Sequence, residues 1–407
     1  MSADPGQLAT LATPLLDAQL RAMEPQALRP HVGPLRAAAQ AGRLRSSREA
    51  EDDARAVLAF LQAGMRGRSI HPEHALWIID LSPGDGERAW RMLRIFEREA
   101  PRGPPLRYLA CCLDAAQHEA LAMHAPFVQW RADGRFCLDP DDRGLPLHPL
   151  RNPVVVLAHE AFSARAQHLF RIRAGDSAGS RTGGRSGDIV QAWRDAGGRV
   201  QWRDLRRGDG NCRLLSAHGV RDGLFLTLPH AGMALLDTIL RASGGRMLLR
   251  ATDDGLYEPA RIAADGLRCD GDGPPQVNYD ALSRWHRANG GQSFQSRGPI
   301  DGRVLHIALH DVEGGRLREC LPDVLALPHP DEHVQLLQAI ATLRAPSDAV
   351  CRALLRATGH DPRAWATLPN LAGAAAFTGT LDPWIASQAC AGSAIATSAT
   401  LHENDDG

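Results

Sequence analysis

The sequence of 407 residues contains no lysine, so all 46 of its basic side chains are arginine. This absence excludes a P-loop lysine, a lysine Schiff base for pyridoxal phosphate and a Ser-Lys dyad. The 47 acidic residues nearly balance the arginines and leave a formal net charge of -1. A balanced chain gives no global attraction to nucleic acid or to acidic membranes. We therefore expect neither nucleic acid nor a membrane as a partner.

Cysteine and long apolar runs are also scarce. Cys111 and Cys112 are adjacent and the other six cysteines are dispersed without a CxxC, which excludes a zinc ribbon, a thioredoxin motif and a disulfide scaffold. The beginning of the chain has no basic stretch followed by an apolar core, and no apolar run reaches the roughly 20 residues of a membrane span. These features predict a soluble protein of the reducing cytoplasm.

The composition that remains is that of a folded protein. Hydrophobic residues make up 44% of the chain and charged residues 23%, which is enough apolar surface to form a core. The length fits one large domain with additions, or two to three domains. The composition and periodicity predict a helical cap at 1–70, an α/β domain at 71–320 with a Gly/Ser/Arg-rich loop near 173–188, a helical region at 321–389 and a flexible tail at 390–407.

Short apolar segments alternate with helical ones from residue 76 onward. Ser46 and Glu49 form a capping-box pattern that predicts the start of a helix before this region. Strands followed by helices, and apolar on both faces, are typical of a parallel sheet covered by helices. The predicted fold class is α/β, with a doubly wound, mostly parallel, Rossmann-like sheet. Strands are expected at 76–81, 107–114, 135–139, 154–162, 246–251 and 304–310, and helices at 87–99, 115–124 and 279–289.

The segment LWIIDLSPGDGERAW at 76–90 carries the clearest ligand signal. A strand that ends in an acid, Asp80, is followed by a turn that contains Ser82, Gly84 and Gly86, and then by a helix. Glycines let the backbone approach a ligand, and a helix start directs N–H groups at its acidic groups. Asp114 ends the next predicted strand, where a carboxylate can accept both hydroxyls of a ribose. The alternative is a plain strand–helix turn in which Asp114 is a capping residue.

On these residues the chain resembles a known family, the class I S-adenosylmethionine-dependent methyltransferases, in the MidA-like branch that includes mitochondrial complex I assembly relatives. The resemblance implies S-adenosylmethionine as cofactor and a protein or peptide as methyl acceptor. In the family's glycine motif Gly84 and Gly86 match, whereas Ser82 stands in place of the first glycine. The segments that carry the resemblance are 76–90, RYLACCLDAAQHEALAMHAPF at 107–127, RNPVVVLAHEAFSARAQHLFRI at 151–172 and VNYDALSRWHRANGG at 277–291.

Two further candidates, His159 and Glu160, lie near the carboxyl end of the most apolar predicted strand, 154–162. MidA-like relatives have an Asn-Glu pair there, so Glu160 matches and His159 departs from the pattern. The resemblance implies that Glu160 binds the acceptor, with His159 as a base. A downstream acid of the relatives is replaced by Ser163. The alternative is a polar strand end that bonds only to neighbouring backbone.

An acid beside the third predicted strand can bind the adenine amino group. Asp133 and Asp139 flank that strand; we favour Asp133, although either residue can also belong to a turn. His306 and His310 lie on one predicted strand about 13 Å apart, too far to share an ion. His329 and His333 have no third ligand in view. No metal site is predicted.

The sequence thus favours a cytoplasmic S-adenosylmethionine-dependent methyltransferase that acts on a protein or peptide side chain. The rival hypothesis is an inactive member of the same fold that serves as an assembly or interaction module; Ser82, Pro83 and Ser163 motivate it. A nucleotide-dependent oxidoreductase is disfavoured by the short glycine pattern. The oligomeric state does not follow from the sequence.

Overall fold

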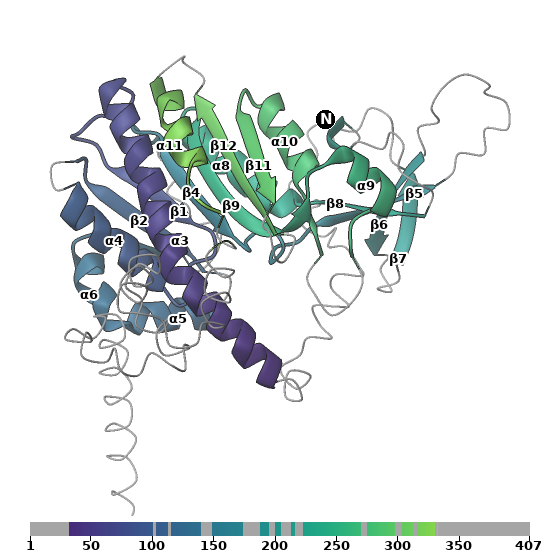
Figure 1. Cartoon of the computed structure of the whole chain (residues 1–407), viewed down its shortest axis with the longest axis horizontal. Coiled ribbons are helices and arrows are strands. Elements are labelled where there is room, and N and C mark those ends of the chain that lie inside the picture. Colours follow the sequence, from purple (N-terminus) through teal and green to yellow (C-terminus); the bar gives the residue numbers. More distant parts are fainter. Residues whose placement is uncertain are drawn as a thin grey trace, which may run out of the picture. The chain divides into compact units, whose positions relative to one another are not determined.

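The structure is a computed structural model. It describes residues 32–100, 103–112, 115–139, 149–173, 188–194, 200–204, 213–215, 223–269, 275–297, 303–311, 316–329 and 332. The chain divides into two compact units. One contains β1 to β3 with most of α3 and α4 to α6, and η2 and α11 return to it from later in the chain; the other contains β4 to β12. Figure 1 labels most of these elements.

The first unit contains a parallel three-stranded run in the order β1-β2-β3. This is the 3-2-1 order of one half of a doubly wound fold. Its helix α4 buries Ala89, Met92, Leu93 and Phe96, the three- and four-residue spacing of one helix face. The elements are α3 (Val32–Arg66), β1 (Leu76–Asp80), α4 (Glu87–Glu99), β2 (Leu106–Cys111), α5 (Ala115–Met123), α6 (Ala125–Ala132), β3 (Phe136–Asp139), η2 (Arg316–Cys320) and α11 (Leu321–Leu325).

The second unit contains the run β11-β12-β9-β4, with the two-residue β10 paired to β9. β4 and β9 are parallel, and β12 runs antiparallel between β9 and β11. All six residues of β4 are buried, as expected for a strand covered on both faces. The elements are β4 (Val154–His159), α8 (His230–Ala242), β9 (Arg246–Leu256), α9 (Pro259–Asp265), β10 (Val277–Asn278), α10 (Tyr279–Ala288), β11 (Gln292–Arg297) and β12 (Arg303–Asp311).

The same unit contains a second sheet that the sequence did not predict. Its four antiparallel strands have the order β7-β6-β5-β8 and follow β4 along the chain (Figure 1). The expected Gly/Ser/Arg-rich loop begins and ends in this sheet, and its residues 174–187 lie outside the described residues. The strands are β5 (His168–Arg173), β6 (Asp188–Arg194), β7 (Val200–Asp204) and β8 (Phe225–Leu228).

The predicted fold class is confirmed. Strands β1, β2 and β3 pair in parallel, as do β4 and β9, and helices connect these strands along the chain. The predicted start of the first helix is wrong, because α3 runs from Val32 to Arg66 and Ser46 lies inside it. The Ala-rich stretch before Ser46 has high helix propensity, so the capping-box pattern does not interrupt the helix. Most of the expected helical region 321–389 and the tail 390–407 lie outside the described residues.

Candidate functional site

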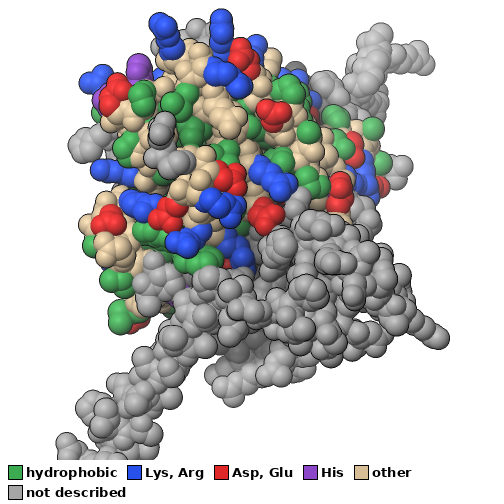
Figure 2. All heavy atoms as spheres, turned by 60° about the vertical axis from the view of Figure 1, so that its left-hand side comes forward, with side chains coloured by type: hydrophobic (Ala, Val, Ile, Leu, Met, Phe, Trp, Pro, Cys, Tyr) green, Lys and Arg blue, Asp and Glu red, His purple; other side chains and the backbone are tan. Residues whose placement is uncertain are grey.

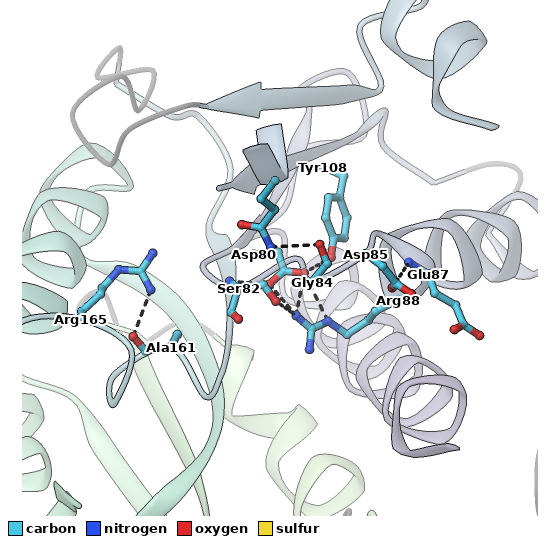
Figure 3. A network of polar contacts seen from close by, with 10 residues as sticks. Asp80, Ser82, Gly84, Asp85, Glu87, Arg88, Tyr108, Ala161 and Arg165 are labelled. Atoms are coloured by element: carbon cyan, nitrogen blue, oxygen red, sulfur yellow. Dashed lines mark hydrogen bonds and ion pairs between the residues drawn. The ribbon is translucent and has the colours of Figure 1, made fainter. Parts of the chain in front are cut away.

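The turn that joins β1 to α4 is closed by its own polar groups (Figure 3). The Ser82 N–H donates to Oδ1 of Asp80 at 3.0 Å, and the Gly86 N–H donates to the Pro83 carbonyl at 3.0 Å. Asp85 accepts the Glu87 N–H through Oδ1 at 3.1 Å, where α4 begins. These bonds give the glycine turn one defined conformation at the carboxyl end of β1, the edge where open α/β sheets bind ligands.

Two other side chains of the first unit donate hydrogen bonds to the carboxylate of Asp80. Arg88 donates to Oδ1 and Oδ2 from Nη2, at 2.7 and 2.8 Å, and the Tyr108 hydroxyl donates to Oδ2. Asp80 is fully buried. Burial by itself would lower the pKa of Arg88, but the charges of Asp80, Tyr108 and Asp53, together with the hydrogen bond to Asp80, outweigh it, so the pKa of Arg88 is raised overall. Burial and the nearby Asp80 raise the pKa of Tyr108.

Asp80 is therefore placed to organise the turn, and its buried carboxylate is not presented to a ligand. Arg88 also donates to the Ser82 carbonyl at 2.5 Å, so one guanidinium joins the strand end to the turn (Figure 3). The sequence analysis missed Arg88 and Tyr108. An arginine in the first turn of the helix, eight residues after the strand-ending acid, was the available signal for Arg88.

The two glycines of the turn differ in their surroundings. Both have positive φ, +58° at Gly84 and +87° at Gly86. A Cβ placed on Gly84 would meet nothing within 4 Å, so this backbone lies open to an approaching group. A Cβ on Gly86 would lie 2.6 Å from the ring of Phe127 and 2.7 Å from Leu121. Gly84 therefore suits contact with a ligand, whereas Gly86 is required by packing inside the protein.

The remaining candidate residues of the first unit do not lie at one common place. Asp114 lies outside the described residues. Asp133 is the C-cap of α6, accepts from Gln129 at 2.8 Å and precedes β3, so it lies at the amino end of that strand and is not brought to the ligand edge. Asp139, the alternative, is the last residue of β3 and is buried at the carboxyl end. Placement thus favours Asp139 over Asp133, because parallel strands bind ligands at their carboxyl ends.

In the second unit, His159 ends β4 and Glu160 begins the turn after it. His159 is 6% exposed, whereas the Glu160 side chain is 57% exposed and forms an ion pair with Arg303 of β12. Glu160 has a φ of +54°, a conformation that is uncommon for residues other than glycine. Ser163 donates its N–H to Oδ2 of Asp253 at 2.9 Å. Asp253 was missed by the sequence analysis, because it lies 90 residues from Ser163 in the chain.

His306 and His310 of β12 form a buried cluster with His286 of α10. Nδ1 of His286 and Nε2 of His310 lie 2.8 Å apart, and the rings of His286 and His306 stack at 5.2 Å. No group of three metal-ligating side chains with metal-site geometry occurs among the described residues. Burial lowers the pKa of all three histidines, that of His306 to about 3. His329 is buried, and His333 lies outside the described residues.

Sequence comparison identifies neither a matching family model nor a matching curated protein. Structural comparison lists a protein from Burkholderia thailandensis bound to S-adenosyl-homocysteine, with 16% identity, coverage of 81% of this chain and 73% of that chain, and a TM-score of 0.44. A second structure from that organism has 16% identity, coverage of 81% and 76%, and a TM-score of 0.45. Magnesium protoporphyrin IX methyltransferase from Synechocystis, also with bound S-adenosyl-homocysteine, has 11% identity, coverage of 65% and 86%, and a TM-score of 0.31.

Proposed function

We propose that the protein is an S-adenosylmethionine-dependent methyltransferase that acts on a protein or peptide side chain. The observation that carries the proposal is the turn between Asp80 and Glu87. Its open Gly84 follows a parallel strand and precedes a helix start, where backbone N–H groups favour acidic ligand groups. The choice of a protein or peptide acceptor rests on the resemblance to MidA-like proteins.

The residues of the first unit would hold the cofactor. Gly84 offers its backbone, Ser82 and Gly86 shape the turn, and Asp80 with Arg88 keeps that shape. Asp114 is proposed for the ribose hydroxyls and Asp139 for the adenine amino group. The cofactor supplies an activated sulfonium methyl, so the protein has mainly to align an acceptor and to remove its proton where required.

On the acceptor side we propose Glu160 as the group that binds and orients the acceptor. More than half of its side chain is exposed, so an acceptor can reach the carboxylate, and its ion pair with Arg303 limits its directions. His159 is nearly buried, so a role as proton acceptor would require its ring to open toward the acceptor. We therefore assign acceptor binding to Glu160 and retain His159 only as a secondary candidate, for removal of the acceptor's proton.

The cellular setting is part of the proposal. We propose the reducing cytoplasm, where disulfides are rare; within the described part of the chain, Cys111, Cys112, Cys137, Cys269 and Cys320 form no disulfide. No helix within the described ranges is long and apolar enough to cross a membrane. Figure 2 shows arginine and acidic side chains interspersed on the face in view, without a continuous basic area of the kind that nucleic acids bind.

Titration calorimetry of the full chain with S-adenosylmethionine and S-adenosyl-homocysteine tests the proposal. We expect binding of both, and a loss of at least about 1 kcal/mol for Asp114→Asn, the usual scale of a hydrogen bond to a charged group. The absence of binding by the wild type would favour the rival, an inactive interaction module. That rival is supported by the complete burial of Asp80 and by Ser82 in place of a glycine.

A further inference from the structure

The turn that follows β4 is attached to its neighbours at three points of the second unit. The Glu160 N–H donates to the Thr252 carbonyl of β9 at 2.7 Å, and the Ser163 N–H donates to Asp253 at 2.9 Å. Between them, Arg165 donates to the Ala161 carbonyl at 3.0 Å (Figure 3). Both ends of the turn therefore depend on consecutive residues of β9.

These attachments hold Glu160 in a backbone conformation that it would not choose alone. Its φ of +54° costs free energy for a side chain with a Cβ, and such a conformation persists only where the surrounding structure imposes it. The same conformation sends the Glu160 carboxylate to Arg303, which β12 contributes opposite Asp254. The direction of the carboxylate thus depends on the turn being held.

Asp253 is an unusual residue to hold a turn for stability alone. It is 1% exposed, and its two oxygens accept the N–H groups of Ser163 and Asp254, each at 2.9 Å. Burial raises the pKa of Asp253 to about 6, against the lowering effect of these hydrogen bonds, and the charge of Asp254 raises it further. The Tyr279 side chain of α10 also faces it, and burial together with the charge of Asp253 raises the pKa of Tyr279. A buried carboxylate with a raised pKa lowers stability when it is ionised, so its presence suggests another role.

We propose that Asp253 is a positioning residue that holds the Glu160–Ser163 turn, and thereby directs the Glu160 carboxylate toward the methyl acceptor. The inference rests on the acceptor-binding role proposed for Glu160. Asp253 acts through the backbone of Ser163 and does not touch the reacting atoms. Protonation removes the charge that attracts the Ser163 N–H, so the turn is held most firmly when Asp253 is ionised.

Nuclear magnetic resonance of the full chain labelled with ¹⁵N-serine tests the attachment without cofactor or substrate. Ser163→Ala identifies the Ser163 signal by its disappearance. We expect the Ser163 amide to shift with pH in the wild type with a midpoint near the pKa of about 6. The shift should vanish in Asp253→Asn and persist in Asp254→Asn, the matched control, whose carboxylate binds Gln276 and Arg268 instead. A Ser163 amide signal with the same position and pH dependence in the wild type and in Asp253→Asn would overturn the proposal.

Methyl transfer tests the positioning role. In Asp253→Asn one amide oxygen replaces two acceptors, so one N–H of the pair loses its partner. We expect kcat to fall by about 10- to 100-fold, the scale of a displaced catalytic group, with cofactor Kd and acceptor KM nearly unchanged. Asp254→Asn should keep kcat within about twofold. Unchanged kcat in Asp253→Asn would refute the positioning role, whereas a wild type that binds no cofactor would refute the proposed function and leave the resonance experiment to decide the attachment.

Discussion

The guanidinium of Arg88 binds the carboxylate of Asp80 inside the first unit and, with the same Nη2, the carbonyl of Ser82. A strand end, a turn and a helix start are thereby joined by one buried cation. The relationship gives the glycine turn a defined shape before any ligand arrives, which reduces the ordering cost of binding.

Removing Arg88 should be costly because it leaves a buried charge without its partner. We expect Arg88→Met to lower the free energy of unfolding by about 3–5 kcal/mol, and the double variant Asp80→Asn/Arg88→Met to lose less. Arg94→Met is the control, since Arg94 forms an exposed pair with Glu97 that is worth about 0–1 kcal/mol. Urea unfolding measures all three. Equal losses in the Arg88 and Arg94 variants would show that the buried pair contributes no more to the free energy of unfolding than the exposed pair does.

The two glycines of the turn should respond differently to alanine. Gly84→Ala places a Cβ in open space, so it should cost only the roughly 1–2 kcal/mol of a positive φ while it weakens S-adenosylmethionine binding. Gly86→Ala should lower stability by about 1–3 kcal/mol or more, since its Cβ would overlap Phe127. Calorimetry and urea unfolding separate the two effects. A Gly84→Ala protein with wild-type affinity would remove Gly84 from the binding site.

The buried histidines should make the second unit sensitive to acid. The pKa of His306 falls from 6.5 to about 3 on folding. The unfolded chain therefore binds a proton that the folded chain does not, and stability is lost as the pH falls below 6.5. His306 alone should contribute a loss of about 2 kcal/mol between pH 7 and pH 5. Asp253, with its raised pKa, works in the opposite direction over the same range.

Because these two effects oppose each other, the useful measurement compares variant and wild type. His306→Gln should lose about 2 kcal/mol less than the wild type between pH 7 and pH 5 in urea unfolding. Equal losses in both proteins would show that His306 takes up a proton as readily in the folded state as in the unfolded state.

Glu160 should matter for transfer and little for stability. Glu160→Gln keeps the shape and removes the charge, so methyl transfer should fall by about 10²-fold while cofactor affinity is retained. The pair with Arg303 is largely exposed on the Glu160 side, so unfolding should change by less than about 1 kcal/mol. The assay uses labelled cofactor with a lysate of the source cell. Undiminished labelling by the variant would place the chemistry elsewhere.

His159 should tolerate asparagine better than alanine. The side chain is nearly buried at the end of β4, so alanine leaves a cavity and should lower stability by about 1–3 kcal/mol. Asparagine keeps polar atoms in the site and is the residue of the MidA-like pattern. Thermal unfolding with labelled transfer compares the two variants. A reversed order of tolerance would show that the site does not accept the residue type of the MidA-like pattern.

Local patterns were sufficient for the parallel part of the fold. The helix predicted at 87–99 is α4, Glu87–Glu99, and the most apolar predicted strand became β4, Val154–His159. In each of these segments, the spacing of the apolar residues is enough to predict the secondary structure. The small sheet of β5 to β8 was not predicted, because its strands are short and the sheet pairs segments far apart in the chain, such as β5 with β8.

The sequence by itself determined where the glycine turn lies, since a strand, a glycine turn and a helix follow one another within 15 residues. Only the tertiary structure decided what each residue does there. Asp80 meets Tyr108 across 28 positions and Asp253 meets the backbone of Ser163 across 90, and no local pattern specifies contacts between segments so far apart in the chain. The roles of Gly84 and Gly86 were separated for the same reason: what a Cβ would meet is set by Phe127 and Leu121, which come from other helices.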